Sequence, residues 1–393
     1  MSHVQQLLHV GRALAAAGGE CVLATLVEVN GSSFRRPGAR MLIQSDGTVT
    51  GGISAGCLEE EICGKCFEWT RDGACVKEFH VGGVEDELFG WGSGCKGKLC
   101  VLLQRVDSTN ALIANTLRAI GARETCVIAT ICSNDARMQF LCGAHFLLAG
   151  DGVHSDAPQE LREILAIEAR QCRADGISRN SRYATPEGEL SVLWEIIEPP
   201  IQLCVFGSGE SVARLFDCAR EMGWRTFVCD KRSEMYNRMQ GLKADGIFEC
   251  VPGDLPDDLK CDPRTAAVVM THHFADDLSI VSTLLNSAIP YVGVLGGRVR
   301  NQRLREELAR EVLRPQFEKL FAPIGLNLGA EDAPEIALAI TGEILAFMNG
   351  RNPGHLKDEK ESIHKPFPID HHALIRSSAA HYENLCQPSQ RSY

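Results

Sequence analysis

The stretch that decides the fold is Ile201–Asp230, IQLCVFGSGESVARLFDCAREMGWRTFVCD. It opens with a short apolar run, as expected of a strand buried on both faces of a parallel sheet. Gly207-Ser208-Gly209 follows at once, then apolar residues at helical spacing, then a second apolar run that ends in Asp230. Asp230 stands about twenty residues beyond the glycines, as in dinucleotide-binding units. Strand, glycine turn, helix, strand and acid in this order predict a Rossmann domain.

The same stretch gives a mixed prediction about a ligand. In such units the glycines, here Gly207 and Gly209, let the backbone approach a pyrophosphate, and the acid, here Asp230, accepts hydrogen bonds from a ribose. However, Val212 stands where a small residue is usual, and Glu210 puts a negative charge at the phosphate-facing helix start. Two interpretations stay open: a NAD(P) site, and a Rossmann-shaped scaffold with little nucleotide affinity.

Two later apolar runs, Ala266–Met270 and Tyr291–Leu295, extend the predicted parallel sheet. Thr271-His272 follows the first of them, where open α/β sheets place their ligands. His272 is therefore a candidate site residue, with an ordinary histidine at a strand end as the alternative.

Length and composition predict two domains. A chain of 393 residues exceeds the size of one compact core, and Glu198-Pro199-Pro200 breaks it, because proline neither donates to a sheet nor continues a helix. We expect an N-terminal α+β domain over residues 1–197 and a Rossmann-like domain with a parallel sheet over 198–349. Residues 350–393, polar and rich in histidine, are expected to be a disordered tail. The predicted fold class is α/β.

Charge and cysteine usage restrict the partners and the compartment. A net charge of −11 argues against nucleic acid or an anionic membrane as the main partner, and no run of eighteen apolar residues predicts a membrane span. Seventeen cysteines lie scattered through apolar segments without a framework. Scattered thiols in a chain without a secretory signal are typical of reduced, buried cysteines in the cytoplasm.

The first domain carries a glycine-rich loop with arginines. Residues 31–41, GSSFRRPGARM, contain Arg35, Arg36 and Arg40. Guanidinium groups on such a loop are suited to a phosphate or another oxyanion, while a solvated charged face is the alternative.

Two further loops carry cysteines. Residues 51–60, GGISAGCLEE, place a thiol and carboxylates where a loop enters a predicted helix, and residues 92–97, GSGCKG, place a second thiol among glycines. A thiol at a helix N-terminus has a lowered pKa and is a ready soft ligand, although buried core cysteines are common. The candidate residues of these loops are Ser54, Cys57, Glu59 and Cys95.

The pair Cys63-Gly64-Lys65-Cys66 has the spacing of a redox or metal motif. It falls inside a predicted helix, and no second pair stands at zinc-ligand spacing. We interpret it as incidental, and we predict no metal site.

Taken together, these motifs resemble the XdhC/CoxI family of xanthine dehydrogenase accessory factors, over most of Cys21–Gly350. The three loops carry the likeness, as do the junction Trp194–Pro200 and the glycine turn. Further matching segments are Asp230-Lys231-Arg232, Met270-Thr271-His272, Gly293–Arg298, Ala322–Ala330 and Pro334–Ala337. This chain departs from the family pattern at Phe34, Ala55, Lys96, Glu210 and Asn327.

The resemblance implies a maturation factor without catalytic residues. Such a protein binds molybdenum cofactor (molybdopterin) transiently and delivers it to an apo molybdenum hydroxylase of the xanthine dehydrogenase type. By this likeness the arginine loop would hold the phosphate of the pterin, and Cys57 and Cys95 would face the molybdenum. A sulfurase and a second copy of the chain are further partners that the resemblance leaves open.

Two other function classes remain. One is a NAD(P)-dependent oxidoreductase that uses the Rossmann domain, with His272 as proton donor. The other is a thiol redox or metal-binding protein that uses Cys57, Cys95 and the Cys63/Cys66 pair.

Overall fold

The computed structural model describes residues 3–31, 33–54, 56, 58–81, 97–133, 135–150, 152–185, 188–230, 242–256, 259–311, 316–360 and 367–373. The chain forms two compact units. Unit 1 comprises Met1–Pro199 together with His364–Tyr393, and unit 2 comprises Pro200–Ile363. The boundary between them therefore falls inside the Glu198-Pro199-Pro200 break.

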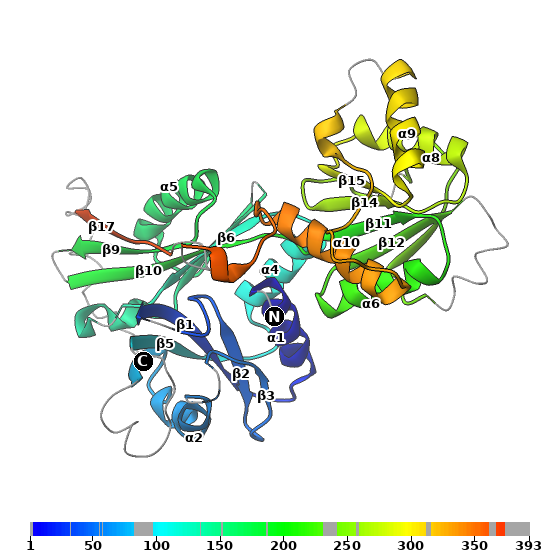
Figure 1. Ribbon diagram of the computed structural model, residues 1–393. Coiled ribbons are helices and arrows are strands. Elements are labelled where there is room, and N and C mark those ends of the chain that lie inside the picture. Colours follow the sequence, from blue (N-terminus) through cyan, green and yellow to red (C-terminus); the bar gives the residue numbers. More distant parts are fainter. Residues whose placement is uncertain are drawn as a thin grey trace. The chain divides into compact units, whose positions relative to one another are not determined.

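Unit 1 begins with helix α1 (His3–Ala16) and a five-stranded antiparallel sheet, here called sheet A (Figure 1). The strand order is β3 (Val49–Gly51), β2 (Arg40–Gln44), β1 (Cys21–Gly31), β5 (Gly97–Val106) and β4 (Cys75–Val81). Helix α2 (Glu59–Trp69) connects β3 to β4. The hairpin predicted at Asp46-Gly47 joins β2 to β3, which pair in antiparallel register.

Sheet A is covered on both faces, which is why β1 reads as a continuous apolar run. Val22 and Ala24 pack with Ile62 of α2 on one face. Cys21 and Leu23, alternating with them, pack on the other face in a cluster that includes residues of α1. The period of two along the strand thus sends successive side chains to different helices.

A second sheet, sheet B, completes unit 1, so residues 109–197 belong to the first unit. Its order is β17 (Ile369–Ala373), β9 (Arg179–Thr185), β10 (Gly188–Ile197), β6 (Cys126–Ile131), β7 (His145–Ala149) and β8 (Gly152–Ser155). Helix α5 (Gln159–Asp175) packs on one face of this sheet through an apolar cluster. Helix α4 (Ala111–Gly121) packs on the other face.

Strand β17 corrects the prediction that the whole segment 350–393 is disordered. It pairs in parallel with β9, from Ile369 against Asn180 to Ala373 against Ala184, and the backbone N–H of Asn180 donates to the carbonyl of Pro368 at 3.0 Å. Composition missed the strand because a polar segment gains order when a sheet edge supplies the missing hydrogen bonds.

Unit 2 is an all-parallel, six-stranded Rossmann domain. The strand order is β13 (Gly246–Glu249), β12 (Arg225–Asp230), β11 (Gln202–Phe206), β14 (Thr265–Val269), β15 (Tyr291–Val294) and β16 (Leu320–Phe321). Numbered from β11 this is the 3-2-1-4-5-6 order of dinucleotide-binding folds. The predicted fold class and the parallel sheet are thereby confirmed.

Four helices cover the two faces of this sheet (Figure 1). Helices α6 (Glu210–Glu221) and α10 (Ala333–Met348) pack on one face, where Val212 and Phe216 are buried. Helices α8 (Phe274–Leu285) and α9 (Arg298–Glu311) pack on the other. In the part of the chain that the structure describes, no helix combines the length and apolarity that a membrane crossing requires.

Candidate functional site

The three loops singled out in the first domain leave the same end of sheet A. Strand β1 ends at Gly31, which pairs with Gly97 at the start of β5, and Gly97 pairs with Val81 at the end of β4. Strand β2 begins at Arg40 and its antiparallel partner β3 ends at Gly51. The strand ends that bound the connections 32–39, 52–58 and 82–96 therefore lie at one end of the sheet. The sheet topology thus brings together strand ends that are far apart in the sequence.

The arginine loop keeps two cations near the surface. The guanidinium of Arg35 lies over the ring of Phe34, 5.3 Å from its centroid, and Phe34 as a residue is 66% exposed. Burial lowers the pKa of Arg36, yet a guanidinium stays protonated at neutral pH. Both side chains remain candidates for binding an anion.

Arg40 does not fit the predicted role of an anion ligand. Its Nη1 and Nη2 atoms donate to the two carboxylate oxygens of Glu195 at 2.9 and 2.5 Å, and Nη1 also donates to the carbonyl of Gly38 at 2.8 Å. The side chains of this pair are only 3% and 1% exposed. The guanidinium is therefore engaged inside the protein, and Arg40 fastens the arginine loop to β10.

Helix α1 completes this buried polar cluster. Gln6 accepts a hydrogen bond from the backbone N–H of Arg40 at 3.2 Å and donates to the carbonyl of Gly52 at 3.2 Å. Burial lowers the pKa of His3, against the opposing effect of nearby Glu195. Sequence reasoning did not single out Glu195, Gln6 or His3. The available signal was Glu195 itself, a carboxylate within an apolar strand, because a buried charge needs a partner.

Glu59 folds the loop that carries Cys57. Its carboxylate accepts hydrogen bonds from the hydroxyl of Ser54 and from backbone N–H groups. The donors of these N–H bonds, at 2.7–3.3 Å, are Ile53, Ser54, Gly56 and Leu58. Burial raises the pKa of Glu59, but the bonds from Ser54 and the backbone outweigh it, and the pKa is lowered overall. Ser54 and Glu59 thus shape the loop through contacts with each other.

Two predicted cysteines, Cys57 and Cys95, lie outside the described residues. Their flanking elements are described: α2 begins two residues after Cys57, and β5 begins at Gly97. The Cys63/Cys66 pair lies inside α2 as predicted, and burial raises the pKa of both thiols. Cys66 is part of the core of sheet A. Among the described residues no three ligating side chains are grouped to hold a metal ion.

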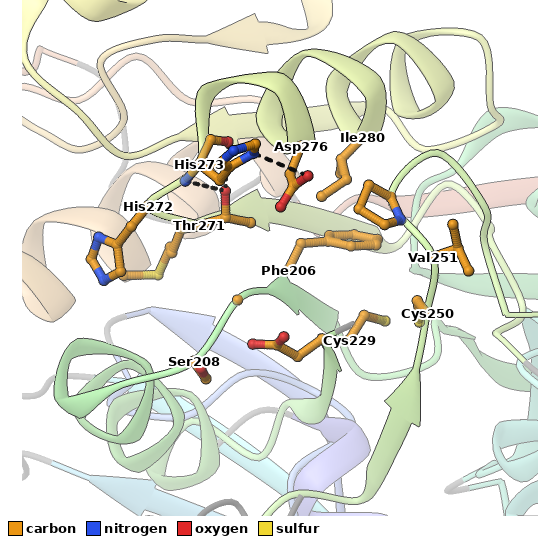
Figure 2. A pocket seen from close by; sticks show the side chains of 14 residues that line it. Phe206, Ser208, Cys229, Cys250, Val251, Thr271, His272, His273, Asp276 and Ile280 are labelled. Atoms are coloured by element: carbon orange, nitrogen blue, oxygen red, sulfur yellow. Dashed lines mark hydrogen bonds and ion pairs between the residues drawn. The ribbon is translucent and has the colours of Figure 1, made fainter. Parts of the chain in front are cut away.

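A second candidate site lies in unit 2, at the carboxyl ends of β11, β12 and β14 (Figure 2). Gly207, Asp230 and His272 all line this pocket. Gly207 has φ +119°, and a Cβ there would lie 2.7 Å from the carbonyl oxygen of Met270. Only glycine therefore lets the turn pass this strand end. Gly209 is the N-cap of α6 with φ +132°.

The polar groups of this pocket are largely engaged with one another. His273 Nδ1 lies 3.2 Å from the carboxylate of Asp276, and Thr271 donates to buried Asp277. Figure 2 shows the ring of His272 directed away from the His273–Asp276 pair. Hydrogen bonding to Cys204 and burial raise the pKa of the Cys229 thiol, which lines the pocket. That thiol is neutral and is not an activated nucleophile.

The glycine turn retains the two features that oppose a pyrophosphate. Glu210 is the exposed first residue of α6, at its N-terminus. Val212 is 1% exposed and packs into the core of unit 2. The pocket lies where nucleotides bind in this fold. The negative charge at the N-terminus of α6, however, repels a phosphate group.

Comparison with known proteins finds one family across both units. Residues 14–80 match the model of the XdhC and CoxI family, and residues 203–344 match the model of the XdhC Rossmann domain. A Bacillus subtilis protein described as a probable subunit of xanthine dehydrogenase is 28% identical over 331 residues, 83% of this chain and 92% of that protein. The molybdenum cofactor insertion chaperone PaoD of Escherichia coli is 21% identical over 340 residues, 84% of this chain and 83% of its own.

A solved structure has the same fold. The crystal structure of a xanthine dehydrogenase from Bacillus halodurans matches with a TM-score of 0.70 at 27% identity. The match covers 92% of this chain and 98% of that one. Both units of the present chain are therefore found together in a related protein.

Proposed function

Because the chain belongs to the XdhC and CoxI family, we propose that it is a maturation factor for a molybdenum hydroxylase of the xanthine dehydrogenase type. It binds molybdenum cofactor as cargo and releases it to the apo-hydroxylase. The names of its relatives support the role, since one is a molybdenum cofactor insertion chaperone. The observation that carries the proposal is that the strand ends bounding the three loops lie at one end of sheet A.

In this proposal the phosphate of the pterin contacts Arg35 and Arg36. Both belong to the loop that the buried Arg40–Glu195 pair anchors. An anchored loop loses less conformational freedom on binding than a free one, which favours affinity. Each charge-assisted hydrogen bond contributes about 1.5–3 kcal/mol. Two such contacts are strong enough to retain the cofactor and weak enough to release it to the apo-hydroxylase.

Cys57 and Cys95 are proposed to face the molybdenum, for which thiolates are soft ligands. What supports this is the position of both residues in the chain, two residues before α2 and two residues before β5. A thiol must lose its proton to ligate a metal, and binding of the metal would drive that deprotonation, as in other thiolate sites.

The test is reconstitution of a purified apo-hydroxylase by each variant loaded with cofactor. Cys57→Ala is expected to lose most cofactor retention and transfer. Cys63→Ala is the matched control, since its thiol lies within α2 with a raised pKa, and it should transfer as wild type does. If Cys57→Ala activates the hydroxylase as well as Cys63→Ala does, the proposed site is wrong.

A second function is favoured by one observation, the pocket of unit 2 at the switch point of the sheet with Asp230 in its wall. This is where dinucleotides bind in such folds, and it would suit a NAD(P)-dependent oxidoreductase. Because Glu210 repels phosphate, we expect little heat in calorimetry at millimolar NADH or NADPH. Micromolar binding that Asp230→Ala abolishes would instead favour the oxidoreductase.

The other function class and the other partners stay predictions. A thiol redox role gains nothing from Cys63 and Cys66, whose raised pKa values keep them protonated. A sulfurase and a second copy of the chain are partners suggested only by the family resemblance.

A further inference from the structure

Unit 1 contains a polar cavity of about 370 Å³ between its two sheets. Sheet A contributes residues of β1 and β5, and sheet B contributes residues of β9 and β10 and of the segment after β6. A volume of this size lies within the range that holds small organic ligands, roughly 300–1,000 Å³. None of the residues that line the cavity was singled out by the sequence.

The cavity lies beside the loop end of sheet A. Two of its residues, Glu28 and Lys98, stand close to Gly31 and Gly97, where the arginine loop and the segment 82–96 connect. The register of β1 against β5 shifts between Leu26 and Glu28. Such a bulge re-aims a side chain, and bulges are frequent next to functional sites.

Charged side chains of both signs line the cavity. Arg182 donates from Nη2 to both oxygens of Glu28 at 2.8 Å, and its buried Nε has no hydrogen-bond partner among the described residues. The carboxylate of Glu189 is about half exposed and 3.8 Å from Arg182. Lys98 adds an ammonium group, itself paired with Glu78 at 2.6 Å. Cations and carboxylates around one cavity suit a ligand that both donates and accepts hydrogen bonds.

Asp135 adds a third carboxylate to the lining and accepts a hydrogen bond from the backbone N–H of Glu189 at 3.2 Å. The other lining residues are neutral. Val27 and two cysteines, Cys100 and Cys132, contribute apolar surface. Burial, and then the charge of Glu28, raise the pKa of Cys100 to about 11. A protonated thiol behaves as a small hydrophobe that can contact the face of a flat ring.

We propose that this cavity binds the 2-amino-4-oxopyrimidine edge of a pterin. The amino group and ring N–H of that edge donate side by side, which matches one carboxylate such as Glu189. Its carbonyl oxygen accepts from the ammonium group of Lys98. The proposal rests on the proposed function, because the cargo there is a pterin, and it places the ring next to the loop that would hold the phosphate.

Free 6-hydroxymethylpterin is the probe, since it has neither phosphate, dithiolene nor metal. Binding to the full chain is followed by quenching of pterin fluorescence. Ser191→Leu narrows the cavity without removing a charge, and Glu189→Gln replaces the proposed carboxylate with a neutral amide. Each should weaken binding at least tenfold. Glu163→Gln, which changes an exposed carboxylate on α5, is the matched control and should bind as wild type does.

Guanine presents the same edge, so GMP is a second arm. Pterin binding that GMP does not displace supports the proposal, whereas displacement by equal or lower GMP would make a guanine nucleotide the ligand and overturn it. Absence of pterin binding at millimolar probe, or binding by Ser191→Leu and Glu189→Gln equal to that of wild type, also overturns it. The two proposals fail separately. If Cys57→Ala loses cofactor transfer but the wild-type chain does not bind the free pterin, only the cavity proposal is refuted. If the wild-type chain binds the free pterin but Cys57→Ala transfers cofactor normally, only the proposed delivery site is refuted.

Discussion

The buried pair of Arg40 and Glu195 offers a sharp test of how unit 1 holds its arginine loop. Glu195→Gln keeps the shape of the side chain but leaves the guanidinium without its counter-charge. Both groups are almost fully buried, at 3% and 1% exposure, and the bond is bidentate at 2.9 and 2.5 Å. Removing one partner of such a pair costs about 3–5 kcal/mol, because the other charge stays buried and unpaired.

The assay is urea denaturation followed by the fluorescence of buried Trp194, the neighbour of Glu195 in β10. The matched control is Glu61→Gln, which breaks the exposed pair of Glu61 and Lys65, whose side chains are 46% and 53% exposed. An exposed pair of this kind contributes about 0.3–0.5 kcal/mol.

The double variant Arg40→Met/Glu195→Leu distinguishes the loss of the ion pair from the cost of leaving one buried charge without a partner. Replacing both charges with apolar groups should recover most of the loss, since no buried charge then remains unpaired. With the single variants Arg40→Met and Glu195→Leu completing the double-mutant cycle, the coupling energy should exceed about 3 kcal/mol, because each single variant leaves a buried charge unpaired at a cost of about 3–5 kcal/mol and the double variant leaves none. A loss for Glu195→Gln no larger than that of Glu61→Gln would refute the reasoning.

Three further predictions concern the loop, the helix behind it and the glycine turn. Replacing Arg35 and Arg36 together by alanine should weaken cofactor binding by about 1.5–3 kcal/mol for each lost contact. Equilibrium dialysis of the loaded protein measures this, and unchanged retention would show that this loop does not bind the phosphate. Burial lowers the pKa of His3 below 6.5, so the unfolded state takes up the proton first and unit 1 should lose stability as the pH falls below about 6.5. His3→Gln should flatten that part of the stability profile, and an identical profile would contradict it. Gly207→Ala should destabilise unit 2 by more than Gly209→Ala in calorimetry, because both glycines have positive φ but only Gly207 has backbone within 2.7 Å of the added Cβ; equal losses would show that conformation alone decides.

The sequence determined most of unit 2. The order of strand, glycine turn, helix, strand and acid in Ile201–Asp230 is a local pattern, and the structure reproduces it as β11, α6 and β12. Hydrophobic periodicity and turn-forming residues depend on near neighbours in the chain, so they can be recognised from the sequence alone. The same holds for the hairpin at Asp46-Gly47 and for the helix that carries Cys63 and Cys66.

Only the tertiary structure decided which polar groups are engaged with distant parts of the chain. In the sequence Arg40 is as good a candidate for an anion ligand as Arg35 and Arg36, but in the structure its guanidinium is bound by Glu195, 155 positions away. Strand β17 exists because β9 offers an edge to a segment whose composition predicts disorder. The cavity at Glu28 needs two sheets to form its walls. Each of these depends on contacts between segments remote in the chain. Composition and period leave such contacts open, since a charged side chain, a polar segment or a bulge is compatible with several partners until packing selects one.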